Sequence, residues 1–228
     1  MKEDFSINHA VVMAAGRGLR MRPLTDSMPK AMAPLGESNL ISEGIKKLKK
    51  EISNVHITVG YKGAMLASHV IENDVSTVIN TEGKGNAWWL YNSLLSNIDS
   101  PIFVLTCDNI IKINFTSYAE EYSQIGSPAC MIIPANPIED IEGDFILHDS
   151  KNFIKSLSRH DKTKIMSSGV QILNPAKINA ITKSTQEFNN LWQQLIDLKE
   201  IKCSKKVLDS WYSVDDLAQL HHAKKSLK

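Results

Sequence analysis

The 228-residue sequence has few cysteines and no long apolar run, and each shortage excludes a class of protein. Three cysteines lie far apart, at Cys107, Cys130 and Cys203. They are typical of reduced thiols rather than of disulfides or a zinc site, so the expected compartment is the cytoplasm. No window approaches the roughly 20 apolar residues of a membrane helix. The first residues, MKEDFSINH, also contain no apolar stretch of the kind that precedes the cleavage site of a signal peptide. No membrane association is therefore expected.

A shortage of net charge argues against polyanionic partners. The 26 basic and 25 acidic residues leave a formal charge of +1 and are spread along the chain. No strong field is present that would gather nucleic acid. Apolar content, by contrast, is ample, because 43% hydrophobic residues can build one large core. We expect a single domain over residues 1–228, and no repeat or linker divides it.

Short runs rich in Val and Ile alternate with segments of helical period, a pattern that predicts an α/β fold with a mostly parallel sheet flanked by helices. The expected strands are Ala10–Ala15, Val55–Gly60, Thr77–Ile79, Ile102–Thr106 and Ala129–Pro134. The expected helices are Leu40–Glu51, Gly63–Glu72, Gly85–Leu95 and Ser117–Gln124. After Pro134, closely spaced runs predict a small antiparallel extension, with strands at Phe145–His148, Phe153–Leu157 and Gly169–Leu173 and helices at Thr185–Leu198 and Val214–Lys225.

The stretch AVVMAAGRGLRMRPLTDSMPK joins the first strand to a cationic loop. Gly16 and Gly18 allow a sharp turn whose N–H groups can face phosphate oxygens. Ligands of open α/β sheets bind outside the carboxyl ends of the strands, where this loop should lie. The loop therefore predicts a polyphosphate site. Its cations are Arg17, Arg20, Arg22 and Lys30.

Other glycine-loop motifs fit this stretch less well. A dinucleotide fingerprint requires glycine at position 21, which is Met21, and an immediate helix, whereas Pro23 and Pro29 are expected to keep the segment extended. A P-loop requires a Gly-Lys-Ser/Thr triplet, and the sequence has none. The plain alternative is an ordinary strand-to-helix turn with solvated arginines.

AAGRGLRMRPLT followed by PKAMAPLG resembles the signature of the sugar-phosphate nucleotidyltransferase superfamily. That superfamily includes sugar-1-phosphate nucleotidyltransferases and bacterial phosphocholine cytidylyltransferases. The resemblance implies a Rossmann-like fold, with a nucleotide-binding half to about residue 134 and an acceptor-binding half from about residue 135. The positions that match are Gly16, Gly18, Arg20, Pro23, Leu24, Thr25, Pro29 and Lys30.

The resemblance also implies roles for individual residues. Arg20 would hold the triphosphate and the transition state, and Lys30 would bridge the α-phosphate and the incoming phosphate. Both are therefore candidate catalytic residues. The nucleotide would be contacted by the first loop and by the segment NTEGKGNAWWLYNSL, at Ala14, Ala15, Gly16, Gly18, Gly85 and Asn86.

Two acidic positions are candidate ligands for Mg²⁺, which prefers carboxylate and phosphate oxygens. Asp108 follows the apolar run PIFVLTC, and the superfamily carries a metal-binding aspartate at the end of this strand. A second such aspartate lies near the C-terminus, where the register of WYSVDDLAQL favours Asp215 over Asp216. The alternatives are a turn-forming Asp-Asn dipeptide at Asp108 and a helix N-cap at the Asp215 pair.

The acceptor pocket is implied by SSGVQILNP, which resembles the glycine-led strand of the superfamily, and places Ser168 and Gly169 there. Arg159 is a further acceptor-binding candidate, with a solvated turn as its alternative. Trp88, Trp89 and Tyr91 are either core residues or an aromatic wall for a quaternary ammonium group.

Three functions follow from this resemblance. The leading one is Mg²⁺-dependent transfer of a nucleoside monophosphate from a nucleoside triphosphate to a sugar 1-phosphate. The second is a CTP-dependent cytidylyltransferase for phosphocholine or a similar phosphorylated alcohol. The third is a nucleotide-sensing module without turnover. The base, the acceptor and the choice between monomer and homodimer stay open.

Overall fold

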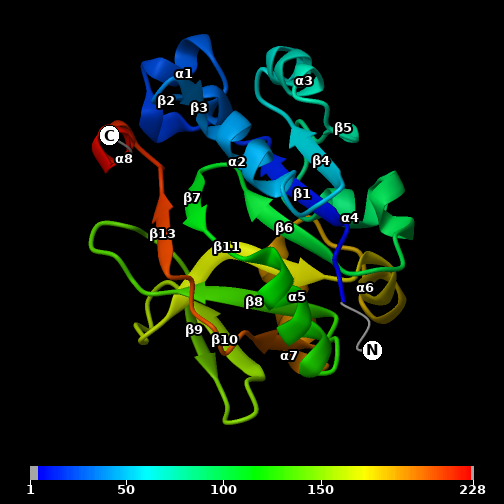
Figure 1. Cartoon of the computed structure of the whole chain (residues 1–228). Coiled ribbons are helices and arrows are strands. Elements are labelled where there is room, and N and C mark those ends of the chain that lie inside the picture. The colour runs from blue at the N-terminus through cyan, green and yellow to red at the C-terminus, as the bar shows by residue number, and fades with distance from the viewer. Residues whose placement is uncertain (1–4, 227–228) are drawn as a thin grey trace.

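An apolar run near the N-terminus forms an inner strand of the main sheet. The computed structural model describes residues 5–226, and β1 (His9–Ala14) lies between two parallel neighbours (Figure 1). These are β4 (Asn54–Val59) and β6 (Ile102–Thr106), and β5 (Thr77–Asn80) pairs in parallel with β4. All four carboxyl ends therefore lie at one edge of the sheet, where ligands of such sheets bind.

The second half of the chain extends this sheet with antiparallel strands. β11 (Met166–Leu173) pairs with β6 and with β8 (Cys130–Ala135). β9 (Phe145–His148) and β10 (Ile154–Ser158) form a hairpin beside β11, and β12 (Ile201–Cys203) pairs in parallel with β8. The result is a nine-stranded mixed sheet, so the predicted α/β class and its antiparallel extension are confirmed.

Helices cover both faces of the sheet because neighbouring strand residues point in opposite directions. Val12 belongs to one buried cluster and Val11 to another. The first cluster packs under α2 (Leu40–Leu48), α3 (Gly63–Glu72) and α5 (Phe115–Gln124). The second packs under α4 (Trp88–Asn92), the 3₁₀ turn η3 (Leu94–Asn97), α6 (Pro175–Ile181) and α7 (Phe188–Asp197).

A third, smaller buried cluster joins the glycine loop to the C-terminal helix. α8 (Leu217–Ser226) lies beside the first loop in Figure 1, although about 200 residues separate them. The loop contains short turns and one small hairpin: η1 (Leu19–Met21), α1 (Leu24–Ser27), η2 (Lys30–Met32), β2 (Pro34–Leu35) and β3 (Ser38–Asn39). A second two-stranded sheet joins β7 (Asn109–Lys112) to β13 (Ser210–Ser213).

Two local predictions were wrong. The segment from Pro23 to Pro29 is not extended but forms the helical turn α1, because Pro23 stands at the N-cap, where its missing N–H costs nothing. The helix expected from Gly85 begins only at Trp88. The backbone before it bonds elsewhere: Ala87 N donates to Gln186 O at 2.9 Å.

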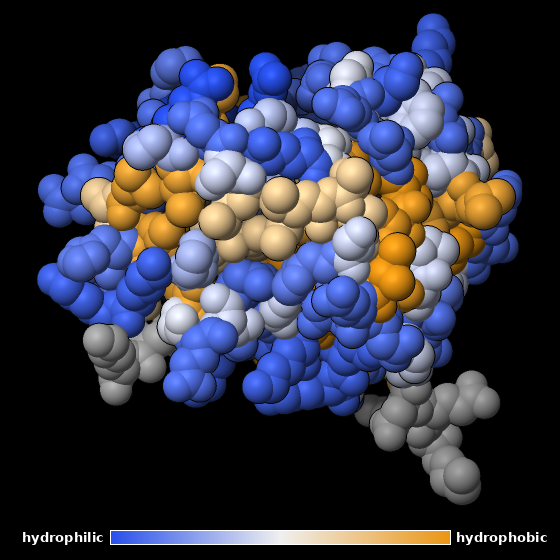
Figure 2. All heavy atoms as spheres, turned by 90° about the horizontal axis from the view of Figure 1, so that it is seen from above, coloured by the Kyte–Doolittle hydropathy of each residue, from blue (hydrophilic) through white to orange (hydrophobic). Residues whose placement is uncertain are grey.

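The surface combines polar residues with exposed apolar side chains, among them Ile71 and Leu94. Hydrophilic residues cover much of the face shown in Figure 2, with apolar patches between them. Within residues 5–226, none of the helices combines the length and the apolar character that a membrane span requires.

A stacked pair of histidines, of which His56 is buried and His9 half-buried, predicts that the fold is sensitive to acid. His56 stacks on His9 with ring centroids 5.3 Å apart, and burial, aided by His9, lowers the pKa of His56 from 6.5 to about 4. Between these pH values the unfolded chain binds a proton that the folded chain does not. The free energy of unfolding should therefore fall as the pH drops through this window, by about 2 kcal/mol between pH 7 and pH 5.

Urea denaturation at pH 7 and pH 5 checks this expectation. His56→Gln keeps a polar partner for Thr77 Oγ1, which lies 2.8 Å from His56 Nδ1, but removes the titration. Most of the pH-dependent loss should disappear in this variant. An equal loss in the variant and the wild type would show that other groups cause it.

Candidate active site

Two clefts meet at the carboxyl edge of the sheet. The large cleft has a volume of about 890 Å³ and lies between the glycine loop and residues 81–86. The small cleft has a volume of about 250 Å³ and lies between β11, α7 and residues 142–144. Their shared wall is formed by Met13, Arg20, Asn86, Thr106, Asp108 and Asp215.

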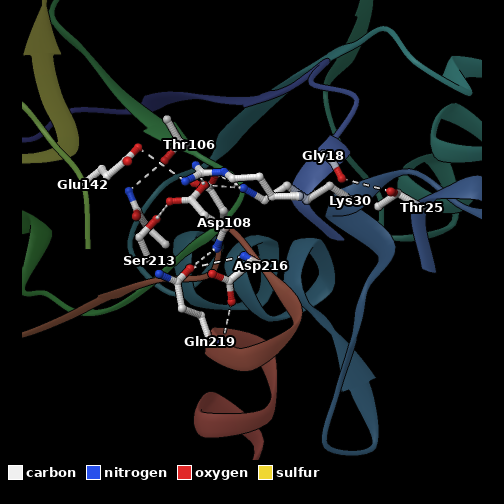
Figure 3. A network of polar contacts seen from close by, with 12 residues as sticks. Gly18, Thr25, Lys30, Thr106, Asp108, Glu142, Ser213, Asp216 and Gln219 are labelled. Atoms are coloured by element: carbon white, nitrogen blue, oxygen red, sulfur yellow. Dashed lines mark hydrogen bonds and ion pairs between the residues drawn. The ribbon is translucent and has the colours of Figure 1, made fainter. Parts of the chain in front are cut away.

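Lys30 reaches this shared wall from beneath the glycine loop. Lys30 is only 8% exposed, and the first atoms of its side chain lie against Gly18. A Cβ atom on Gly18 would lie 2.7 Å from Lys30 Cβ, and the φ angle of Gly18 is +62°. Glycine is thus required here for two reasons, because it adopts the left-handed conformation and leaves room for the lysine. Thr25 Oγ1 fastens the turn by donating to Gly18 O at 2.9 Å (Figure 3).

The ammonium group of Lys30 lies between two carboxylates. Its Nζ is 2.6 Å from Asp108 Oδ2 and 2.8 Å from Asp215 Oδ1 (Figure 3). Arg20 Nη2 approaches the same oxygen of Asp215 at 3.2 Å. Of the charged residues predicted for the site, Arg20, Lys30, Asp108 and Asp215 therefore converge on one point. Arg22 does not line the clefts and pairs with Asp26 at 3.1 Å.

The pKa values in this cluster follow from the charges. Burial alone would lower the pKa of Lys30, but Asp108 and Asp215 outweigh it, so this pKa is raised. Burial would raise the pKa of Asp215, but Lys30, then Arg20 and Ser213, together lower it. Lys30 and Asp215 are consequently both charged near neutral pH.

The small sheet of β7 and β13 holds the two aspartates together. Ser213 on β13 pairs with Asn109 on β7. Asn109 directly follows Asp108, and Ser213 lies two residues before Asp215. Val214 N donates to Asp108 O at 3.0 Å, and Ser213 Oγ lies 3.2 Å from Asp215 Oδ2. The sequence analysis missed this sheet, because four-residue strands carry too little periodic signal.

The side chains of the adjacent aspartates Asp215 and Asp216 make different contacts. Asp216 Oδ1 accepts from Gln219 N at 2.8 Å and so caps α8. The side chain of Gln219 binds the neighbouring aspartate, because its Oε1 accepts from Asp215 N at 2.6 Å (Figure 3). This exchange turns the side chain of Asp215 toward Lys30 and leaves Asp216 at the helix end.

The large cleft contains most of the predicted nucleotide contacts. Ala15, Gly16, Gly18, Gly85 and Asn86 line it. Ala14 lies in the core beside it.

Sequence reasoning missed part of the lining of this cleft. Tyr61 donates to Thr25 O at 3.0 Å and carries the guanidinium carbon of Arg17 at 5.1 Å from its ring centre. Its position shortly after β4, next to Gly60, was the available signal, because the carboxyl end of that strand faces the cleft.

Gly85 shows how residues 85–87 are held against the segment that precedes α7. A Cβ atom on Gly85 would lie 2.1 Å from Gln186 O. Asn86 Oδ1 accepts from Phe188 N at 2.8 Å, so this side-chain oxygen caps α7. These contacts join the segment that lines the large cleft to the start of α7, which lines the small cleft.

Gly85→Ala is expected to lower the free energy of unfolding by about 1–3 kcal/mol, because the new methyl group meets backbone that cannot yield freely. Urea denaturation measures the effect. Gly44→Ala on α2 is the matched control, because a Cβ there meets nothing within 4 Å. That variant should be neutral or up to about 1 kcal/mol more stable. Equal behaviour of the two variants would contradict the close contact at Gly85.

The small cleft contains all three predicted acceptor contacts, but they differ in what they offer. Gly169 has a φ angle of +77°, and a Cβ there would lie 2.6 Å from Asn109 Nδ2. Ser168 Oγ donates to Ile133 O at 2.6 Å, so its hydroxyl stabilises the sheet. Arg159 lies at the cleft with its Nε 3.6 Å from Asp144 Oδ1.

Aromatic side chains that the sequence analysis did not assign to the acceptor also line the small cleft. They are Phe188, Trp192 and Trp211. Trp211 Nε1 donates to Ser168 O at 2.7 Å. The aromatic wall proposed at Trp88, Trp89 and Tyr91 does not form a wall of this cleft, because these residues pack in or against the second core cluster.

The residues present fit a magnesium ion. Within the described residues there is no cluster of three or more His, Cys, Asp or Glu side chains for a metal. Asp108 and Asp215 nevertheless place two carboxylate oxygens within 2.8 Å of a single cation. Mg²⁺ is commonly held by one or two carboxylates together with substrate phosphates, which matches this pair of ligands.

Comparison with known families identifies the type of protein that carries this site. The sequence profile of the nucleotidyl transferase family matches residues 9–210. The chain belongs to the nucleotidyl transferase family. The predicted superfamily and the predicted class of enzyme are thus confirmed.

Individual relatives of this nucleotidyl transferase are distant. A mannose-1-phosphate guanyltransferase from Debaryomyces hansenii is 26% identical over 206 residues, which cover 84% of this chain and 57% of that protein. The chain thus spans little more than half the length of this relative.

Two solved structures share the fold over nearly their whole length. An inositol-1-phosphate CTP transferase from T. maritima has a TM-score of 0.78 at 18% identity, covering 98% of this chain and 97% of that chain. A CTP:phosphocholine cytidylyltransferase from Streptococcus pneumoniae has a TM-score of 0.73 at 20% identity, covering 97% and 100%.

Proposed function

We propose that this protein transfers a nucleoside monophosphate from a nucleoside triphosphate to a sugar 1-phosphate, releasing pyrophosphate and forming an NDP-sugar. One observation carries the proposal: Lys30, Arg20 and two carboxylates meet where the two clefts join. Two substrates that occupied the two clefts would bring their phosphates together there. The mannose-1-phosphate guanyltransferase relative supports a sugar 1-phosphate as the acceptor.

In this reaction a phosphate oxygen of the acceptor attacks the α-phosphorus, and pyrophosphate leaves on the opposite side. Both reactants are anions, so the protein must offset their repulsion and align them. Lys30, held charged by its carboxylate neighbours, would neutralise the α-phosphate and the incoming phosphate. Arg20, at 55% side-chain exposure, can reach the triphosphate from the mouth of the clefts.

Asp108 and Asp215 would hold Mg²⁺ in this proposal. The chemistry that bound Mg²⁺ supplies is charge neutralisation and orientation of the phosphate oxygens. Metal binding would also give the two aspartates a second cation, so that Lys30 would be free to turn toward phosphate.

In this proposal the two substrates would occupy different clefts. Ala15, Gly16, Gly18 and Gly85 would bind the triphosphate and base in the large cleft. Gly169 and Arg159 would bind the acceptor in the small cleft. We also keep a cytoplasmic location within the proposal, because nucleoside triphosphates are supplied there.

Transfer of CMP to phosphocholine is the second candidate. The aromatic lining of the small cleft by Phe188, Trp192 and Trp211 favours it, because aromatic faces attract quaternary ammonium groups. A nucleotide sensor without turnover is less well supported, since it would have no need of Lys30 and two carboxylates around one reacting centre.

Pyrophosphate release tests the proposal directly. The protein is mixed with Mg²⁺, with each of ATP, CTP, GTP, UTP and dTTP, and with a panel of sugar 1-phosphates and phosphocholine. Rapid release with one triphosphate and a sugar 1-phosphate is the expected result. Nucleotide binding without release for any pair would support the sensor and overturn the proposed transfer.

A further inference from the structure

Gln171 is a buried polar residue of the small cleft to which no role has been assigned. It lies on β11 two residues after Gly169 and is 4% exposed. It lines the cleft together with Trp192 and Phe188. Its Oε1 accepts two hydrogen bonds, from Trp192 Nε1 at 3.0 Å and from Cys130 Sγ at 3.3 Å.

These contacts fix the orientation of the Gln171 amide. An indole nitrogen can only donate, so the amide must present its oxygen to Trp192. The thiol of Cys130 also acts as a donor, because burial raises its pKa and keeps it protonated. The amide nitrogen Nε2 must therefore point away from both partners.

The amide nitrogen of Gln171 has no hydrogen-bond partner among the described residues and is not fully buried. Among these residues, Trp89 Nε1 is the one fully buried side-chain nitrogen or oxygen that lacks a hydrogen-bond partner. Gln171 Nε2 is therefore not fully buried. Because Gln171 lines the small cleft, a molecule bound in that cleft could contact this nitrogen. A nearly buried donor that lacks a protein partner is expected to be satisfied by what occupies the cleft.

We propose that Gln171 is a specificity-determining residue whose Nε2 donates a hydrogen bond to an oxygen of the acceptor substrate. This inference rests on the proposed function, and it narrows the acceptor to one that carries a hydroxyl or carbonyl oxygen at the floor of the cleft. A sugar phosphate offers such oxygens. A quaternary ammonium group has no lone pair, so it would leave the amide N–H groups unpaired.

The proposal favours a sugar over phosphocholine even though aromatic side chains line the cleft. Trp192 has two functions in this view, because its ring lines the cleft and its Nε1 sets the direction of the amide. Sugars pack against aromatic faces through their apolar ring surfaces while their hydroxyls form hydrogen bonds. The aromatic lining is therefore compatible with either acceptor. The Gln171 donor, in contrast, can bond to a sugar hydroxyl but finds no acceptor atom in a trimethylammonium group.

Gln171→Glu is the sharpest variant, because a carboxylate of the same shape still accepts from Trp192 but can no longer donate. Steady-state rates are measured with the triphosphate and sugar 1-phosphate that work best, with the monodeoxy forms of that sugar 1-phosphate, and with phosphocholine. We expect the acceptor KM to rise at least tenfold and the triphosphate KM to stay within about twofold.

The deoxy series gives a readout that a merely structural role would not move. In the wild type, one deoxy analogue should bind about tenfold more weakly than the parent sugar phosphate, and Gln171→Glu should abolish that difference. Gln171→Met carries the same test should the glutamate variant fail to fold. Cys130→Ser, which keeps a donor for Oε1, is the control and should retain the discrimination.

The possible failures are distinguishable. Unchanged acceptor KM and discrimination in both Gln171 variants, or equal rises in both KM values, would overturn the inference and leave nucleotidyl transfer to sugar phosphates intact. Preference of the wild type for phosphocholine would overturn the inference and retain nucleotidyl transfer. No pyrophosphate release with any acceptor would overturn both proposals.

Discussion

Asp108→Asn is expected to reduce Mg²⁺-dependent pyrophosphate release by about 10³-fold, the order of effect seen when a group that offsets transition-state charge is removed. The asparagine oxygen can still accept from Lys30 Nζ, which lies 2.6 Å from Asp108 Oδ2. The fold should therefore survive, while the negative charge that binds the metal is lost. Rates of pyrophosphate release and the urea midpoint together measure the effect.

Asp216→Asn is the matched control for this variant. Asp216 is the immediate neighbour of Asp215, but its side chain caps α8. Asparagine caps helices about as well as aspartate, so activity and stability should both stay close to the wild type. Normal turnover in Asp108→Asn, or an equal loss in the control, would contradict the role assigned to Asp108.

Lys30→Met is expected to lower kcat by about 10²–10³-fold and triphosphate affinity by about tenfold or less, because the lysine acts most strongly where charge develops. Methionine keeps the aliphatic stem that passes under Gly18. The variant should also be less stable, because Asp108 and Asp215 lose the cation between them. Mg²⁺ should restore part of this stability.

Single-turnover rates and titration calorimetry separate the two effects of Lys30→Met. Lys49→Met is the control, since Lys49 pairs with Asp74 at the surface, away from the clefts. It should leave both quantities unchanged. Equal losses in kcat and in triphosphate affinity for Lys30→Met would mean that the lysine binds the ground state and the transition state alike.

Local sequence was sufficient to predict which residues of the first half lie at the carboxyl edge of the sheet. Strand ends, the glycine loop and Asp108 are local features, because an apolar run followed by glycine or aspartate places those residues at the carboxyl edge of the sheet. The acid near the C-terminus was located by its resemblance to a family motif. The register favoured Asp215 over Asp216, and the structure shows that Asp215 contacts Lys30 whereas Asp216 caps α8.

The parts that sequence reasoning missed depend on contacts between distant segments. Four-residue strands such as β7 and β13 are stabilised by each other rather than by their own propensity. Gly85 fails to begin a helix because the backbone near Gln186 competes for it, and this contact spans about 100 residues. Likewise, the partners of Gln171 come from a strand and a helix that only the folded chain brings together.

One metal ion and one triphosphate are proposed to bind together where the two clefts join. A crystal structure with Mg²⁺ and a triphosphate whose α,β-bridging oxygen is replaced by a methylene group tests this proposal most directly. We expect Mg²⁺ at about 2.1 Å from carboxylate oxygens of Asp108 and Asp215, with Lys30 Nζ turned to the α-phosphate. A nucleotide bound elsewhere, or one bound with no metal at the two aspartates, would contradict it.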